Sequence, residues 1–292
     1  MDLSAFAAEV GPDGPVTVTG QGTRGGPVAD ARLVRAPAGI EWIAPEEMTA
    51  SCGAGTPVEE LAAALAERGQ RVALPPSGTV GGALAVGRAT VRRLGDGPVR
   101  DALLQARVVT AAGQVAKAGG PTVKNVSGFD LCRLLVGSQG TLAFIGDVIL
   151  RTRPLPPVSR WVAGPGDPFE IRRRLYRPTS ILWDGTTTWV CLEGHPDDVA
   201  AQAALTGLAE VAGPPPLPAG GRRSVPPAEL AGLTGRFVAE VGVGVVHTDG
   251  PVAPAESAPA LVELHRRIKA TFDPTGRLNP GRSVLPEVAV PA

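Results

Sequence analysis

Glycine-dense turns in the first half of the chain constrain its fold more than any other feature. Two of them lie at residues 20–26 and 77–82, and a third region, residues 128–142, places a short apolar helix between glycine turns. Glycine has no Cβ, so backbone N–H groups in such turns can approach a ligand closely and form nests for negatively charged groups. Three such cradles in one chain predict a long ligand that carries a diphosphate.

The composition narrows the classes of function. The chain has 292 residues, is 43% hydrophobic and carries no net charge, with 28 basic and 28 acidic side chains. This balance does not favour nucleic acid or an acidic membrane surface as a partner. Cys52, Cys132 and Cys191 are odd in number and widely spaced, which is typical of reduced thiols in the cytoplasm. No signal peptide and no apolar run of bilayer length is expected, so the sequence predicts a cytoplasmic protein.

The first 150 residues alternate strand and helix patterns. Val16–Thr19 is expected to be a strand that enters the first glycine turn. Thr56, followed by Pro57 and Glu59, predicts a capped amphipathic helix that ends near Gly69. The remaining expected elements of this half share apolar patterns bounded by turns: a hairpin (107–117), a short helix (130–136) and a strand (142–150). The pattern indicates an α+β or α/β fold.

The proline-rich segment 153–157 marks a predicted domain border. Beyond it the expected elements follow a β-α-β-β-α order typical of a ferredoxin-like half: residues 160–163, 169–176, 181–192 and 197–211. Residues 237–247 are apolar enough for one buried strand, and Ser257 is expected to cap a last helix that Asp273 and Pro274 end. We therefore predict three parts: 1–155, 156–256 and 257–292.

The glycine turns and their flanks, taken in order, resemble the FAD-binding proteins of the p-cresol methylhydroxylase and vanillyl-alcohol oxidase fold, and among them the FAD-binding subunits of glycolate oxidase. The segments that carry the resemblance are Pro75–Gly82, Gly97–Asp101, Lys124–Asp130, Gly137–Leu142 and Asp273–Arg282. It is good across residues 10–155 and 260–283. A Rossmann fold is excluded, because no Gly-x-Gly-x-x-Gly joins a strand to a helix with an acidic residue about 20 positions on.

The resemblance implies an α+β architecture with a two-part FAD-binding domain, a short ferredoxin-like cap domain and a C-terminal tail that packs back on the FAD domain. It also implies the residues that hold the cofactor: Gly20, Gly22, Thr23, Pro76, Gly78, Thr79, Val80, Gly81, Gly82, Arg100, Asp101, Asn125, Gly128, Gly140, Thr141, Ile145 and Asn279. Two of these assignments keep an alternative, since Arg100 with Asp101 also fits a surface ion pair and Asn279 a turn.

Departures from the family bear on how the flavin is held. Some relatives attach flavin through a histidine in the first turn, where this chain has about Thr23, and Ser77 is not replaced by cysteine in the second. We therefore expect non-covalent FAD. Gln21 stands where relatives often have glycine, which would loosen the cradle.

The middle of the chain is short for a substrate-binding cap. A 2-hydroxy-acid oxidase needs a cation for the carboxylate and a base for the hydroxyl proton. The chain has three histidines, and His247, after an apolar strand, is the candidate catalytic base, with a structural histidine as the alternative. Arg222 and Arg223 fit either a carboxylate or a solvated pair, and no metal site is visible.

The leading hypothesis is an FAD-binding subunit of a glycolate-type 2-hydroxy-acid oxidase or dehydrogenase, which oxidises a 2-hydroxy acid to a 2-oxo acid or relays its electrons through flavin. Expected partners are the acid, a larger FAD subunit and an iron–sulfur subunit, through which the chain would reach the inner face of the membrane; nucleic acid and a transmembrane segment are not expected. The alternatives are a self-sufficient FAD-dependent oxidoreductase and a structural subunit that has lost FAD.

Overall fold

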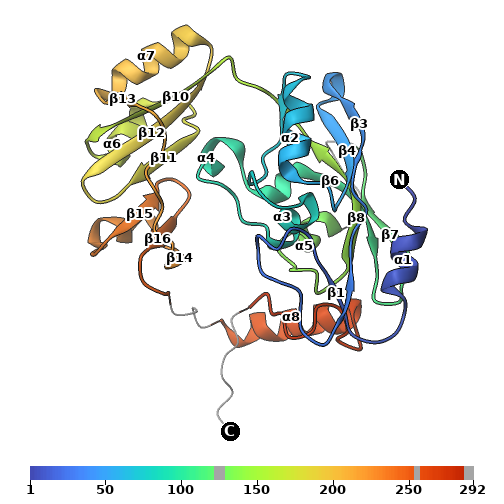
Figure 1. Ribbon diagram of the computed structural model, residues 1–292. Helices are drawn as coiled ribbons and strands as arrows, with labels where there is room; N and C mark the ends of the chain where they lie inside the picture. The colour runs from blue at the N-terminus through green and yellow to red at the C-terminus, as the bar shows by residue number, and fades with distance from the viewer. Residues whose placement is uncertain (122–128, 253–256, 286–292) are drawn as a thin grey trace. The chain divides into compact units, whose positions relative to one another are not determined.

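The computed structural model describes residues 1–121, 129–252 and 257–285. The chain forms two compact units, each assembled from segments that are separate in sequence (Figure 1). The first unit comprises residues 1–89, 98–155 and 255–292, and the second comprises residues 90–97 and 156–254. The α+β fold class is confirmed, since both units combine antiparallel sheets with helices.

The first unit is built on a five-stranded antiparallel sheet with the order β3-β4-β8-β6-β7. Its strands are β3 (Ile40–Ala44), β4 (Thr49–Gly53), β6 (Leu103–Val109), β7 (Val115–Gly119) and β8 (Phe144–Arg151). Strand β4 is buried along its whole length and β8 along most of it, so both lie inside the unit. The expected hairpin and the expected strand after residue 142 are confirmed as β6–β7 and β8.

Three helices pack on this sheet: α2 (Val58–Ala66), α3 (Val80–Val86) and α5 (Leu131–Leu135). Val58, Leu61 and Leu65 lie on one face of α2 and are at most 2% exposed, as their spacing predicts. The predicted cap of α2 is wrong. The Thr56 hydroxyl instead bonds the backbone of Gly39, so it ties two loops together and is not available to the helix.

A second hydrophobic cluster packs a C-terminal residue of the first unit against its N-terminal elements. Helix α1 (Ser4–Val10) packs with β1 (Val16–Val18) and β2 (Arg32–Val34), which pair in parallel. Leu278, fully buried near the end of the chain, bridges to Val16. Helix α8 (Pro259–Phe272) precedes this residue, and the expected stop at Asp273 is confirmed. The smaller elements of the first unit are η1 (Pro45–Glu47), β5 (Gln70–Arg71), η2 (Val99–Ala102) and β9 (Arg153–Pro154).

The second unit contains a seven-stranded sheet with the order β13-β10-β12-β11-β15-β16-β14. Its elements are α4 (Arg93–Asp96), β10 (Val158–Pro165), α6 (Pro168–Arg174), β11 (Ser180–Trp183), β12 (Thr187–Gly194), α7 (Pro196–Thr206), β13 (Ala209–Val211), β14 (Gly221–Ser224), η3 (Pro227–Gly232), β15 (Phe237–Glu240) and β16 (Val245–Thr248). Helices α6 and α7 pack on one face through Ile171 and Val199. The expected β-α-β-β-α order is confirmed by β10 to α7.

Three boundaries in the second half differ from the sequence predictions. The helix predicted for 197–211 ends at Thr206, because Gly207 takes a left-handed conformation (φ +68°) and the chain then forms β13. The single strand predicted for 237–247 is the hairpin β15–β16, which turns at Gly242 and Gly244 with φ +86° and +76°. Helix α8 begins after Ala258 without a side-chain cap, so Ser257 does not cap it.

Among the described residues, no helix is both long and apolar enough to cross a bilayer.

Candidate functional site

The first unit contains an open cavity of about 810 Å³, its mouth and the solvent there included. The cavity is lined by residues from both upstream glycine turns, from the start of β8 and from the C-terminal segment. They are Val18, Thr19, Gly20, Gln21, Gly22, Thr23, Arg24, Gly25, Ala36, Ala54, Gly55, Thr79, Gly81, Gly82, Ala85, Val86, Ser138, Gln139, Gly140, Ala143, Phe144, Ile145, Asn279 and Arg282. The three cradles predicted from the sequence therefore meet at one site.

Glycine is required at several of these positions because the backbones approach closely. A Cβ on Gly20 would lie 2.7 Å from Thr79 Oγ1, and one on Gly81 would lie 2.8 Å from the Cβ of Ala54. Gly22 adopts φ +72°, a conformation that residues with a side chain rarely take. The glycines therefore keep the space of the cavity free of side chains, and they also leave the backbone accessible to a ligand.

The two upstream turns contribute differently. Within the described part of the chain, the backbone N–H groups of Gly20, Gln21 and Gly22 donate no hydrogen bond, so they remain available to a ligand. In the second turn the Gly81 N–H donates to Ala54 O at 2.7 Å, and the Gly82 N–H donates to Thr79 Oγ1 at 3.2 Å. The first turn therefore supplies donors, while the second mainly supplies a wall without side chains.

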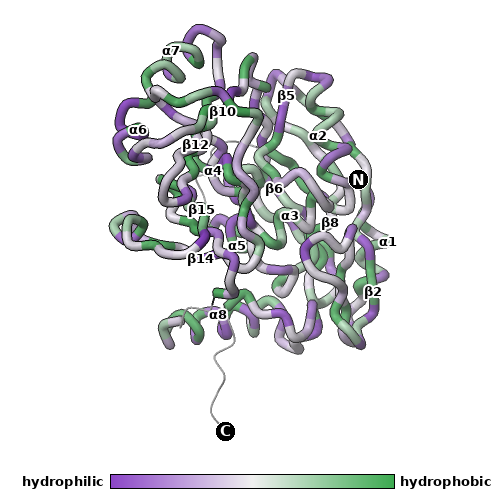
Figure 2. Tube along the Cα trace, turned by 60° about the vertical axis from the view of Figure 1, so that its left-hand side comes forward, coloured by the Kyte–Doolittle hydropathy of each residue, from purple (hydrophilic) through white to green (hydrophobic). Residues whose placement is uncertain are grey.

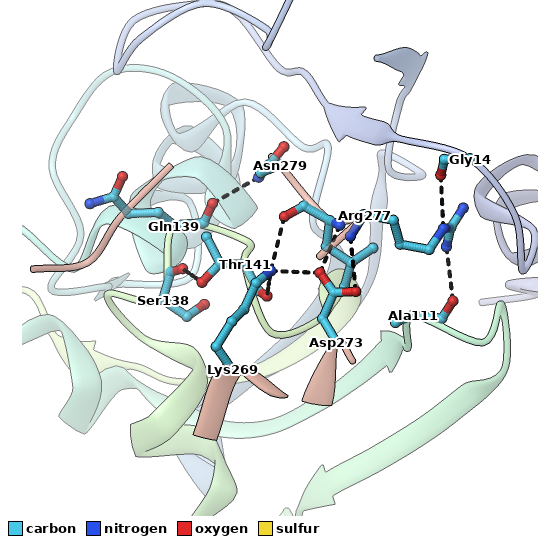
Figure 3. Close-up of polar contacts among 10 residues, drawn as sticks. Gly14, Ala111, Ser138, Gln139, Thr141, Lys269, Asp273, Arg277 and Asn279 are labelled. Carbon is cyan, nitrogen blue, oxygen red and sulfur yellow. Dashed lines mark hydrogen bonds and ion pairs between the residues drawn. The ribbon is translucent and has the colours of Figure 1, made fainter. Parts of the chain in front are cut away.

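Asn279 forms the C-terminal wall of the cavity and is 2% exposed. Its Nδ2 donates to Gln139 O at 2.7 Å (Figure 3). Its Oδ1 accepts from Thr17 Oγ1 at 2.7 Å. A Cβ on Gly140 would lie 2.6 Å from the Asn279 amide nitrogen, so the turn and the tail fit together only with glycine at 140. Asn279 therefore joins three distant segments at the cavity.

A polar network at the end of α8 holds this tail in place (Figure 3). The Asp273 carboxylate pairs with Lys269 and accepts hydrogen bonds from the backbone N–H groups of Arg277 and Leu278, at 3.1 and 2.8 Å. The Lys269 ammonium also donates to Thr141 O at 2.7 Å. Asp273 is 1% exposed, so this paired charge is taken out of water and is satisfied by several donors.

The Arg277 guanidinium binds five backbone carbonyl oxygens and no carboxylate. They belong to Val10, Gly11, Asp13, Gly14 and Ala111, at 2.7 to 2.9 Å. Burial is the largest cause that lowers the pKa of this guanidinium from its usual value. Arg277 thus connects the C-terminal turn to the loop after α1 and to the β6–β7 turn.

The structure brings together only part of the predicted cofactor set. Nine of the predicted residues line the cavity: Gly20, Gly22, Thr23, Thr79, Gly81, Gly82, Gly140, Ile145 and Asn279. Gly78 and Val80 are buried beside it and Pro76 is exposed. Arg100 and Asp101 form an exposed ion pair of 3.9 Å outside the cavity. Thr141 is not among the lining residues, and its hydroxyl donates to Ser138 O. Asn125 and Gly128 lie outside the described residues.

Sequence reasoning missed several lining residues, of which the two arginines matter most. Arg24 lies in the glycine turn 20–26, and Arg282 is the last residue of the segment Asp273–Arg282. Both segments carry the predicted cofactor site. Neither arginine was assigned, because nothing local in the sequence shows which way a surface arginine points. The apolar Ala54, Ala85 and Val86 carry no chemical signal that could have identified them.

The charge of the cavity fits a diphosphate. The described lining residues include two arginines and no carboxylate. Three available N–H groups lie at one end, and close backbone approaches leave room where side chains would otherwise stand. No histidine or cysteine is among these lining residues, so none of them offers a nucleophile for a covalent bond to flavin. The residues present therefore fit non-covalent FAD.

His247 lies on β16 in the second unit and is not among the residues that line the cavity of the first unit. Its Nε2 is 2.8 Å from Oε1 of Glu240, which is 2% exposed, and Arg222 reaches the same oxygen at 3.9 Å. The three side chains come from the adjacent strands β16, β15 and β14. His247 is thus a member of a mostly buried ion-pair cluster.

The described residues contain no group of three or more histidine, cysteine or acidic side chains placed to hold a metal ion. Cys52, Cys132 and Cys191 are buried and unpaired. Burial raises the pKa of the Cys52 thiol to about 12 and those of Cys132 and Cys191 to about 11. These thiols therefore stay protonated at neutral pH and have little nucleophilic character.

Comparison with known proteins agrees with this geometry. Residues 13–119 match the family described as FAD binding domain, and residues 227–283 match the C-terminal domain of FAD linked oxidases. The chain is 34% identical to the glycolate oxidase subunit GlcE of Escherichia coli over 68% of its own length and 61% of GlcE. It is 39% identical to a D-lactate dehydrogenase of Archaeoglobus fulgidus over 37% of its length and 25% of that enzyme.

A solved structure of alkyldihydroxyacetonephosphate synthase shares the fold, with a TM-score of 0.66 over 95% of this chain and 72% of that one, at 14% identity. Fold, cavity and sequence likeness together define an FAD-binding protein of the p-cresol methylhydroxylase type. The chain contains an FAD binding domain and a C-terminal domain of the FAD linked oxidases, and its cofactor is FAD. It spans about three fifths of GlcE and about a quarter of the D-lactate dehydrogenase.

Proposed function

We propose that the chain is the flavin-binding subunit of a glycolate-type 2-hydroxy-acid oxidase or dehydrogenase. The observation that carries the proposal is the cavity of the first unit, where available N–H groups and arginines meet and the described lining has no carboxylate. The likeness to a glycolate oxidase subunit and to a D-lactate dehydrogenase supports a 2-hydroxy acid as the substrate class. Residues 1–155 and 257–292 would hold the cofactor, and residues 156–256 would serve the substrate.

The residues of the chain have defined tasks in this proposal. Bound FAD supplies the acceptor for a hydride from the carbon that carries the hydroxyl group. The N–H groups of Gly20, Gln21 and Gly22 would bind the diphosphate, and Arg282 would balance its charge. Asn279 keeps the C-terminal wall of the cavity closed, because both ends of its amide are bonded within the protein.

His247 remains the proposed base for the hydroxyl proton. Its Nε2 contacts Glu240 Oε1 at 2.8 Å, so the carboxylate would hold the ring and leave Nδ1 to accept a proton. A His247→Gln variant should then lose most turnover while it keeps its flavin. Equal turnover in the variant and the parent across pH 5–9 would leave His247 with a structural role.

We also propose that the chain works beside a larger FAD subunit and an iron–sulfur subunit in the cytoplasm, at the inner face of the membrane. Helix α8 supports a protein partner, because none of its residues is buried although Leu261, Val262 and Leu264 are apolar and 40–50% exposed. Figure 2 shows hydrophobic and hydrophilic residues alternating along it. Purification of the tagged chain from its native cells, with identification of co-purified subunits, tests this part of the proposal.

An absorbance spectrum of the purified chain tests the central proposal. FAD should be released by denaturation and be absent from the protein pellet, as expected of a non-covalent cofactor. Anaerobic addition of glycolate or D-lactate, with and without the co-purified partners, should bleach the flavin. Bleaching of the isolated chain would favour a self-sufficient oxidoreductase. Absence of flavin from both the chain and its complex would contradict the proposal and favour a structural subunit.

A further inference from the structure

Another cavity adjoins the proposed FAD cavity in the first unit. It has a volume of about 670 Å³ with its mouth included and is lined by Thr23, Arg24, Pro75, Val86, Arg88 and Ala89. Thr23, Arg24 and Val86 line both cavities, so the two share a wall. Two of its six lining residues are arginines and none is acidic.

The guanidinium of Arg24 is fixed by its surroundings. Its Nη2 donates to Ser77 O at 2.6 Å, and its Nη1 lies over Gly78, where a Cβ would come within 2.2 Å of it. Gly78 has φ +79°, so this position favours glycine for two independent reasons. A side chain held this firmly across a glycine turn is pre-organised for a ligand at the shared wall.

The positive charge of this cavity is not balanced by the protein. No described carboxylate lies within 4.0 Å of Arg24 or Arg88. The pKa of Arg24 is lowered by burial and, second, by the charge of Arg88, which shows that the two cations act on one another. An oxyanion bound between two like positive charges at a cavity would reduce their repulsion and pair with both.

We propose that Arg24 and Arg88 bind the carboxylate of the small acid on which the protein acts. The inference rests on the proposed function, since a 2-hydroxy acid carries such a group at the carbon next to the one oxidised. Arginine suits the task because its planar fork can donate two parallel hydrogen bonds to a carboxylate. The site lies on the cofactor-holding unit and is separate from Arg222, the arginine that the sequence suggested for this role.

The same chemistry could serve phosphate, either free or as part of FAD, so the experiment separates these sources. Oxalate is the probe, because it has the carboxylate of a 2-hydroxy acid but no C–H bond to oxidise. Calorimetry gives its affinity, and that of inorganic phosphate, for protein with and without FAD. The variants are Arg24→Gln and Arg88→Gln, with the exposed Arg68→Gln as the matched control. FAD affinity is measured separately for each variant by fluorescence quenching.

Oxalate should bind the parent protein and the control alike, and each cavity variant about tenfold or more weakly, as expected for loss of a charge-assisted pair. FAD affinity should change by less than about threefold. Equal oxalate binding in parent and variants would overturn the inference, as would tighter binding of phosphate than of oxalate. A variant that loses FAD while it keeps oxalate would assign Arg24 to the cofactor instead. Arg88 is exposed, so its variant tests the site even if Arg24→Gln folds poorly.

The outcomes also separate this inference from the proposed function. A parent chain that binds oxalate but holds no FAD would contradict the function and leave the anion site standing. A chain that holds FAD and is bleached by glycolate, with no effect of the arginines on oxalate, would contradict only the anion site.

Discussion

Thr17 donates a hydrogen bond of 2.7 Å to Asn279, a residue 262 positions further along the chain. Thr17 is fully buried and Asn279 is 2% exposed. The bond joins β1, which leads into the first glycine turn, to the C-terminal segment that closes the cavity. The C-terminal wall of the cavity and the closure of the first unit therefore depend on the same pair of side chains.

Replacement of Asn279 by Ala should weaken both stability and flavin binding. The change leaves the buried Thr17 hydroxyl proton without its acceptor and the part-buried Gln139 carbonyl without its donor, at a cost of about 1–3 kcal/mol for each group. Asn279 also has φ +46°, which asparagine tolerates better than alanine. Urea unfolding and the flavin content of purified protein give the two measurements. Thr17→Val also removes the 3.2 Å bond from the Val28 N–H, but it leaves the bond between Asn279 and Gln139 in place and should keep more flavin.

Replacement of Arg277 by Lys should destabilise the protein although it keeps the charge. An ammonium cannot reach the five carbonyl oxygens that the guanidinium fork bonds, so several buried acceptors lose their donor. We expect a loss of about 2–4 kcal/mol in the free energy of unfolding. Arg267→Lys, at an exposed position on α8, is the control and should unfold like the parent. Similar unfolding of the two variants would show that the carbonyls find other donors.

Replacement of Gly81 by Val should abolish flavin binding and also strain the fold. Even the Cβ would lie 2.8 Å from the Cβ of Ala54, and the branched side chain would project at the cavity wall. Gly120→Ala, where nothing lies within 4 Å of the added Cβ, should bind FAD normally. Flavin titration of both variants, with thermal unfolding as a check on folding, decides the matter. Full flavin content in Gly81→Val would mean that the cofactor lies elsewhere.

We expect the buried thiols to react slowly with thiol reagents, and we expect the protein to lose stability in alkali. At pH 8 they should react with a thiol reagent far more slowly than in urea, because burial keeps the three thiols protonated. The pKa of Cys52 is about 12 when folded, against about 8.5 in an unfolded chain. Its contribution to stability is therefore complete below about pH 8.5 and declines as pH rises toward 12. Cys52→Ala should flatten the alkaline part of the unfolding midpoint measured against pH.

The glycine turns allowed the cofactor cradle to be predicted because they carry their own signal. Gly20, Gly22 and Gly81 are required by local backbone geometry and close approach, which leave a mark in the sequence. Periodicity likewise revealed α2, whose buried face repeats at helical spacing. Strands β6, β7 and β8 followed from alternating or continuous apolar runs between turns.

Features that depend on partners distant in the sequence are not visible in local sequence patterns. Thr56 has the sequence context of a helix cap, but the backbone of Gly39 is a better placed partner in the folded chain. The turn at Gly242 and Gly244 interrupts a run that reads as one apolar strand. Arg24 and Arg282 gain their significance only when the cavity assembles around them, and a single sequence does not show where an arginine points.

The parallel bridge between Val16 and Leu278 has a consequence for how the protein is made. The chain passes between its two units four times, at residues 89/90, 97/98, 155/156 and 254/255. During synthesis the first unit lacks Arg277, Leu278 and Asn279 until the whole of the second unit has been translated. The first unit therefore lacks the C-terminal wall of its cavity while the second unit is translated. We therefore expect the first unit to hold FAD only after this segment has been made, and chains truncated before Arg277 should be isolated as apoprotein.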